Sequence, residues 1–459
     1  MRRALIAVLC LFSVAVLVSP ASSLPPQTFN DNQAKILFGH TFKEEVWTAK
    51  DVRFQAGNAT ASLAVSYAQH KTVKAFLVAF NNMTVGGKVG TVPYQLFGLR
   101  YYTPEGNEVL IGAVLAFLMA FNDTYDGTGA GANGLPDPGN EQVYYVVPFG
   151  VGDALPGEPY APVAEPMTAQ KLGAGHFRFG QAYRNMYAKV IGANNPLEFL
   201  LSAALPIYIA KFSELSIVYD IKVDEAAGTV VAETFYTIGQ VSKLWLWGQE
   251  VDPKHLNPQW GLCVAHYVVA FTSTYVVTGA NPAVNLQTNI SKRLDEDVAI
   301  RVGQGRERAF EIGHRGTYDL INETTGAKVA EDRDAVAITL HTVGSDFVLV
   351  LWQAVFALDQ FTTLAWACSE HLQGKYNGPR QLWNNARGNF TAGAVWYGTS
   401  FPNWTGYRIE HDPTYTAYAD VDYVETLPDD ERAPSVGVVA ATVALIVPAL
   451  LYASRRRRT

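Results

Sequence analysis

The chain has 459 residues, of which 49% are apolar, 12% aromatic and only 17% charged. This composition excludes a largely disordered protein, and the length is enough for at least one large buried core. The formal net charge is −7 and several of the basic residues lie at the two ends of the chain, so the body is acidic and no nucleic-acid partner is expected.

The N-terminus has the pattern of a secretory signal peptide. Arg2 and Arg3 precede an apolar run from Ala4 to Val18, and small residues before Leu24 offer a cleavage site. We therefore predict a signal peptide over residues 1–23, with an uncleaved anchor helix as the alternative.

Residues 24–147 are predicted to form a β-rich domain. The stretches SLAVSYA, VKAFLVAF, QLFGLRYY and VYYVVPF are rich in aromatic and β-branched residues, and TPEGNE and TVGGK are typical turns. The apolar run VLIGAVLAFLMAF is too short for a membrane helix and indicates a core strand. Residues 148–170 contain several prolines and are predicted to be a linker or a long loop.

A glycine-rich loop follows that apolar run. Five of its side chains carry oxygen atoms that could bind a metal ion: Asp123, Asp126, Asn133, Asp137 and Glu141. Calcium prefers roughly six to eight hard oxygen ligands on flexible backbone. The loop therefore predicts a calcium site, the only cofactor that the sequence suggests. The spacing differs from an EF-hand, and a surface loop rich in turn residues is the alternative.

Residues 171–424 are predicted to form a larger β-rich domain. The stretch from Phe177 to Lys211 is expected to be a minor helical segment that ends or kinks at Pro206. The next stretch, LSIVYDIKVDEAAGTVVAETFYTIG, alternates apolar and polar residues on both sides of EAAG, which predicts a hairpin with one polar face. The whole chain is expected to be mainly β, with one or two sandwich-like extracellular domains.

No catalytic motif stands out in the sequence. A Gly-x-Ser-x-Gly elbow, a zincin histidine pair and a Walker loop are all missing. Glu410, His411 and Asp412 are adjacent, but neighbours on a strand point to opposite faces. The sequence thus leans against an enzyme without deciding the matter.

Tryptophans are a second group of candidates. Trp245 and Trp247 would share one strand face, and a carbohydrate-stacking surface could include others: Trp260, Trp383, Trp396 and Trp404. Packing in the core is the competing interpretation, and the one we expect.

Modification sites fit an exported protein. Seven Asn-x-Ser/Thr sequons predict N-glycosylation on solvent-facing positions: Asn58, Asn82, Asn122, Asn289, Asn322, Asn389 and Asn403. After removal of the signal peptide, Cys263 and Cys368 remain, and an oxidising compartment would permit a disulfide between them. Two buried free thiols are the alternative.

The C-terminus has the pattern of a membrane anchor. An acidic stem, 425–432, precedes an uncharged run, 433–454, which is long enough to cross a bilayer as a helix. Four arginines in the tail, 455–459, predict that this tail stays in the cytoplasm. The motif APSVG, the span and the basic cluster together resemble the C-terminal sorting tails of archaeal cell-surface proteins. APSVG lacks the Pro-Gly-Phe of the best-known class.

Together these features predict a single-pass type I membrane glycoprotein whose ectodomain has a structural or adhesive role at the cell surface. The predicted partners are the membrane, through one C-terminal span, and other surface proteins or glycans. Two alternatives remain open: an ectodomain that binds a carbohydrate or peptide, and an anchored hydrolase whose carboxylates meet only in the fold.

Overall fold

The computed structural model describes residues 46–423 with internal gaps. The gaps are 57–58, 86–87, 91–94, 107, 126–130, 137–139, 149–162, 193, 196, 199–200, 203–204, 206, 254–258, 273–277, 280–297, 303–306, 313–316, 335 and 341–390. The predicted signal peptide, acidic stem, membrane span and basic tail all lie outside the described residues.

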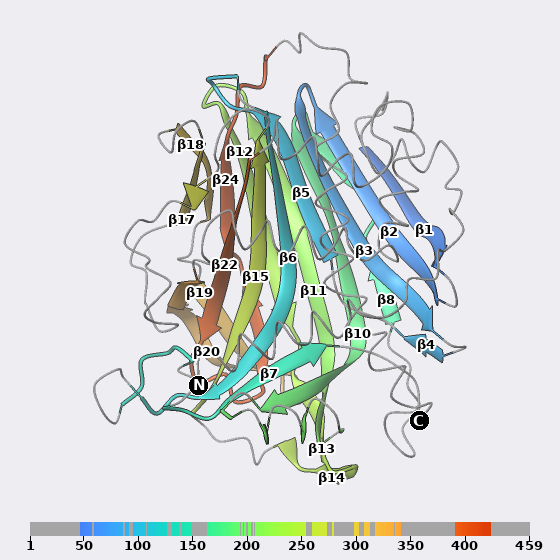
Figure 1. Cartoon of the computed structure of the whole chain (residues 1–459), viewed down its shortest axis with the longest axis vertical. Coiled ribbons are helices and arrows are strands. Elements are labelled where there is room, and N and C mark those ends of the chain that lie inside the picture. The colour runs from blue at the N-terminus through green and yellow to red at the C-terminus, as the bar shows by residue number, and fades with distance from the viewer. Residues whose placement is uncertain are drawn as a thin grey trace.

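The described chain is mainly β, as the sequence predicts, and every strand pairing is antiparallel (Figure 1). One series of strands runs β1 (Val46–Ala56), β2 (Ala59–His70), β3 (Val73–Val85), β5 (Gln95–Tyr102), β6 (Glu108–Asn122), β15 (Trp260–Thr272), β22 (Thr391–Phe401) and β21 (Val336–Leu340). The short strand β4 (Lys88–Gly90) pairs with the end of β3.

A second series is centred on three long strands: β10 (His176–Gly192), β11 (Tyr208–Asp224) and β12 (Thr229–Ile238). Around them pair β8 (Val163–Pro166), β9 (Gln170–Gly173), β13 (Val241–Leu246), β14 (Gln249–Val251), β16 (Thr278–Gly279), β17 (Val298–Val302), β18 (Glu307–Ile312), β19 (Thr317–Asn322), β20 (Ala327–Asp334), β23 (Arg408–His411) and β24 (Thr414–Tyr418). Because β7 (Val143–Pro148) pairs with both β6 and β10, the two series form one strongly curled sheet.

The core lies between the two series of strands. The Phe97 ring of β5 stacks on Tyr219 of β11 at 4.2 Å and lies 6.5 Å from Phe179 of β10. A single buried cluster includes side chains from strands before and after residues 149–162. The domain boundaries proposed from the sequence remain predictions.

The hairpin predicted around EAAG is confirmed. Strands β11 and β12 pair from Leu215↔Ile238 to Asp224↔Thr229, and residues 225–228 form the turn. Gly228 has a φ of 64°, a conformation that glycine adopts without strain. The apolar run before the predicted calcium loop is likewise a strand, β6.

The helical segment predicted between Phe177 and Lys211 is wrong. Most of it forms β10 and the start of β11, and only 197–198 and 201–202 are helical among the described residues of this segment. Aromatic side chains at Phe177, Phe179 and Tyr183 are buried, as is the run 179–183, and β10 pairs with β11 over most of its length. This pairing outweighs the local helical tendency of the segment.

The strands define two ends of the molecule. At one, which we call the exit end, the β2–β3, β5–β6 and β11–β12 turns lie beside residues 419–423, and β1 begins opposite Ala68. At the other, the far end, lie the β6–β7 loop, the β10–β11 connection and the β13–β14 turn (Figure 1). Both ends of the described chain, Val46 and Tyr423, are therefore at the exit end.

Candidate functional site

The predicted calcium loop is at the far end, and its described carboxylates hold the loop itself together. Both oxygens of Asp123 accept backbone N–H groups, from Asn133 at 2.9 Å and from Gly134 at 3.0–3.1 Å. The Oε1 atom of Glu141 accepts the N–H groups of Thr124 and Tyr125, both at 2.8 Å. The two carboxylates thus close the base of the loop.

Burial explains why these bonds matter. Asp123 and Glu141 are both buried, and burial raises the pKa of Asp123 although the two backbone donors act against this rise. The Oδ1 atom of Asn133 accepts the N–H of Leu135 at 2.8 Å. Asp126 and Asp137 lie outside the described residues, and within the described part no three His, Cys, Asp or Glu side chains gather closely enough to hold a metal. Calcium binding stays a prediction.

Sequons with a described backbone gather toward the far end. Asn122 ends β6, Asn322 ends β19, Asn403 lies in the turn between β22 and β23, and Asn82 is late in β3. Thr405 N donates to Trp260 O at 2.9 Å, which ties the Asn403 turn to the start of β15 opposite Asn122. Asn58, Asn289 and Asn389 lie outside the described residues.

Cys263 is a buried residue of β15 and has a free thiol in the structure. Burial raises the pKa of this thiol to about 12, so the thiolate is disfavoured. Its proposed partner, Cys368, lies outside the described residues, and the disulfide remains a prediction.

The tryptophans do not form the shared face that we considered. Trp245 is buried on β13 and packs against Tyr187 at 5.9 Å, whereas Trp247 is exposed. The strand ends at Leu246, and Trp247 has a φ of 53° in the following turn, so the strict alternation of a strand no longer applies. Trp404 is buried and donates its indole N–H to Tyr407 O at 2.7 Å. Trp383 and the side chain of Trp396 are not described.

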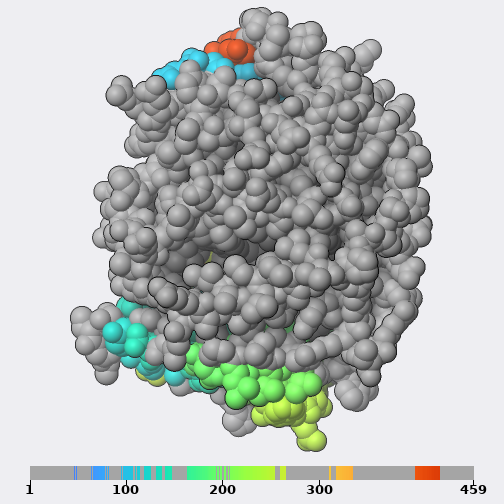
Figure 2. Space-filling view, in the orientation of Figure 1, coloured from blue at the N-terminus to red at the C-terminus, as the bar shows by residue number. Residues whose placement is uncertain are grey.

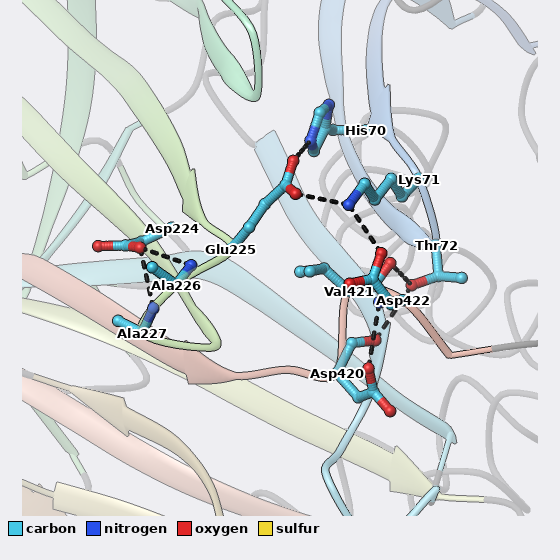
Figure 3. Close-up of polar contacts among 10 residues, drawn as sticks. All are labelled: His70, Lys71, Thr72, Asp224, Glu225, Ala226, Ala227, Asp420, Val421 and Asp422. Carbon is cyan, nitrogen blue, oxygen red and sulfur yellow. Dashed lines mark hydrogen bonds and ion pairs between the residues drawn. The ribbon is translucent and has the colours of Figure 1, made fainter.

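The most extensive described polar cluster lies at the exit end, and we call it the exit latch (Figure 3). Glu225, in the β11–β12 turn, contacts His70 Nε2 at 2.7 Å and Lys71 Nζ at 2.5 Å. Lys71 Nζ also donates to Asp422 Oδ1 at 2.7 Å. Lys71 has a φ of 50°, so the tight β2–β3 turn aims its side chain between two acidic residues.

Backbone contacts hold the same segment. Thr72 Oγ1 lies 3.3 Å from the carbonyl oxygens of both Asp420 and Val421, and Asp420 N donates to Tyr102 O at 2.7 Å. The rings of Tyr102 and Tyr423 stack at 4.1 Å. The last described residues are therefore fastened to three separate turns before the chain continues toward the predicted stem.

The charged groups of the exit latch shift one another's pKa values. Hydrogen bonds to Asp422 and Glu225 raise the pKa of Lys71, and those from Lys71 and His70 lower the pKa of Glu225. Both groups are solvent-exposed, so each ion pair alone contributes little. The latch acts through the number of its contacts, and it contains no arrangement of nucleophile and base.

A second cluster lies on the outer face of the sheet, around Asp220 of β11. The Asp220 side chain is only 2% exposed; His176 Nε2 contacts its Oδ1 at 2.5 Å, and Arg178 Nε donates to its Oδ2 at 2.8 Å. Burial alone would raise the pKa of Asp220, but the bonds from Arg178 and His176 outweigh it and lower the pKa. The cluster is an ion-paired carboxylate, with its partners on the directly paired strand β10.

His411 lies in the interior, and Glu410 beside it is on the outer face, so these neighbours do not converge. His411 Nδ1 donates to Thr317 O at 2.9 Å, and its buried Nε2 has no hydrogen-bond partner among the described residues. Burial lowers the pKa of His411 to about 4, so the imidazole is neutral.

The exit latch and the Asp220 cluster were not predicted from the sequence. Their members are far apart along the chain, and only the alternation in β11 gave a signal, which predicted Asp220 to be on the polar face. Comparison with known protein families, with characterised proteins and with solved structures gives no match. Among the described residues no helix is long and apolar enough to cross a membrane.

Proposed function

We propose that this chain is the ectodomain and anchor of a single-pass, type I cell-surface glycoprotein with a structural or adhesive role. In this proposal the curled sheet described above is the extracellular body of the protein. The signal pattern, the uncharged run 433–454 and the arginine tail motivate the topology.

One observation of the structure carries the proposal: the chain enters and leaves the fold at the exit end, whereas the described sequons lie toward the far end. The strand β6 alone covers 15 residues, about 50 Å at roughly 3.4 Å per residue. An anchor after Tyr423 would thus present the glycans away from the membrane. The exit latch would fix the direction in which the stem leaves.

Protease treatment of intact cells tests the topology. With an epitope tag after Thr459, we expect external protease to remove the body and to leave a tagged fragment containing residues 433–459. In the matched variant, Arg455 to Arg458 are replaced by serine, and we expect weaker retention of the tail on the cytoplasmic side. Digestion of the tag together with protection of the body would show the opposite orientation and overturn the proposal.

A further inference from the structure

A group of exposed apolar side chains occupies the far end. Leu197, Leu201 and Leu205 are 66%, 46% and 42% exposed, and Trp247 is 63% exposed. These four residues, the apolar tip, are half of the large exposed apolar residues in the described part of the chain; the others lie on four separate strands. In Figure 2 the segments around residues 200 and 250 adjoin one another at the lower edge of the molecule, and the latter projects furthest.

Hydrogen bonds define a short helical turn at the leucines. The leucines are spaced by four residues, and Leu205 N donates to Leu201 O at 2.8 Å, as in a helical turn. Asn195 Oδ1 accepts Glu198 N at 2.9 Å and caps the start of this turn. Ser202 is buried beside the leucines, where its Oγ accepts Gly192 N and donates to Glu198 O. The turn is therefore fastened to the body while its leucines face solvent.

Two described backbone N–H groups at the apolar tip have backbone partners. Ile207 N donates to Leu205 O at 2.9 Å, and Trp247 N donates to Ile207 O at 2.8 Å. The strands on either side of Trp247 pair through Leu246↔Gln249. Hydrogen bonds of this kind suit an apolar medium such as lipid, because an unpaired N–H would be costly there.

The charges next to Trp247 are also paired. Lys243 Nζ lies 3.4 Å from Glu250 Oε2 and 5.8 Å from the centre of the Trp245 ring. This pair leaves no excess charge on the β13–β14 hairpin that would require an oppositely charged partner. Tryptophan with neighbouring lysine and leucine is a composition typical of the bilayer interface.

We infer that the apolar tip inserts shallowly into a lipid bilayer. Four projecting side chains are far fewer than the roughly 20–30 residues a side of a stable protein interface, so a second copy of the chain is a poorer fit. Both segments that continue beyond the described residues leave at the exit end, so the tip points away from the anchor if the proposed topology holds. Many weakly inserting copies on one surface would bind a facing bilayer by multivalency.

The test uses the full chain, reconstituted in nanodiscs and mixed with protein-free phosphatidylcholine vesicles, which float in a density gradient. We expect nanodiscs to float with the vesicles, and the double variant Leu201→Ser, Trp247→Ser to reduce the floated fraction at least about tenfold. The matched control Leu172→Ser removes an exposed leucine of β9 and should float as well as the unchanged chain.

Three results would overturn the inference. The first is no flotation of the unchanged chain, and the second is an equal loss in Leu172→Ser. The third comes from repeating the experiment with vesicles that carry the same chain: if the nanodiscs float only with those vesicles, the tip binds another copy of the chain and not lipid. Failure of the chain to enter nanodiscs would count against the proposed anchor alone, and the free protein would then be mixed directly with vesicles. Thermal unfolding of each variant separates loss of the tip from loss of the fold.

Discussion

At the scale of single residues, His411 gives the interior a dependence on pH. Its ring lies 5.1 Å from Phe401 and 6.3 Å from Tyr236, and no described residue bonds to its Nε2. Protonation there would place a charge in an apolar environment, which explains the fall of its pKa from 6.5 to about 4.

Replacing His411 with phenylalanine should flatten the pH dependence of stability. Below pH 6.5 the unfolded chain binds a proton at this residue, and the folded chain does not bind one until the pH falls to about 4. The free energy of unfolding therefore decreases as the pH falls from 6.5 to about 4. A shift of this size corresponds to about 3 kcal/mol in the free energy of unfolding at the acid end. Urea unfolding at pH 7 and at pH 4.5 measures the difference between the two chains.

The variant also leaves Thr317 O without its donor, which should cost about 1–2 kcal/mol at either pH. This cost is independent of pH and does not affect the comparison of slopes. Parallel stability curves for the two chains would show that His411 does not carry the predicted dependence.

At this scale the sequence predicts side-chain direction better than environment. The alternation in β11 correctly separates Tyr219 from Asp220, yet Asp220 is buried on the polar face because Arg178 and His176 of the next strand cover it. Trp247 was misplaced because a turn with positive φ interrupts the alternation. Neither the covering residues nor the φ can be read from local sequence.

At the scale of elements, close contacts between strands depend on glycine facing an aromatic ring. Gly261 of β15 is paired with Phe121 of β6, and a Cβ atom at Gly261 would lie 2.4 Å from the Phe121 ring. Phe121 is fully buried among Met119, Leu135 and Cys263, so the ring has little room to move. A glycine within a strand often marks such an approach.

Gly261→Ala should therefore destabilise the protein by about 1–3 kcal/mol through overpacking. The matched control is Gly173→Ala in β9, where the nearest atom to an added Cβ, on His176, is at 3.8 Å, an ordinary contact. Denaturant midpoints measure both variants. If they unfold at the same midpoint, the ring of Phe121 adapts more easily than its burial implies.

Several of the long strands could be predicted from local pattern, but the segment between Phe177 and Lys211 could not. QLFGLRYY coincides with β5, and the EAAG turn joins β11 to β12. The failure at β10 reflects information held elsewhere in the chain, since its pairing partners include β7, β8, β9 and β11. Among the predicted calcium ligands, the carboxylates of Asp123 and Glu141 accept backbone N–H groups. The number of oxygen-bearing side chains in the loop could not predict this arrangement.

At the scale of the whole molecule, the curled sheet separates two ends with different properties. The exit end holds the ionic latch around Lys71 (Figure 3). The described sequons lie toward the far end, which also carries the apolar tip. Long antiparallel strands fix this separation, because each strand crosses most of the body. The distribution of glycans is therefore a direct test of the arrangement.

We expect glycans on Asn403 and Asn322 and none on Asn122 in the folded protein. Asn403 is exposed in a turn, and Asn322 Oδ1 accepts Thr324 N at 3.0 Å at the tip of a hairpin. Asn122 instead has a buried Oδ1 and precedes the buried Asp123, so a glycan there would have to displace the base of the β6–β7 loop. Mass spectrometry of glycopeptides, from a host that N-glycosylates exported proteins, measures the occupancy of each sequon.

A pair of substitutions at Thr405 supplies the control: Thr405→Ser preserves the Asn403 sequon, and Thr405→Ala removes it. Both variants change the same residue, whose backbone has a φ of 46°. A difference in glycan mass on Asn403 between them therefore reflects the sequon and not a change in the turn. Only the serine variant should keep the mass of a glycan on Asn403. Full glycan occupancy of Asn122 in a protein with unchanged unfolding would contradict this expectation. It would show that the hydrogen bonds of Asp123 and Glu141 to the β6–β7 loop do not keep Asn122 inaccessible.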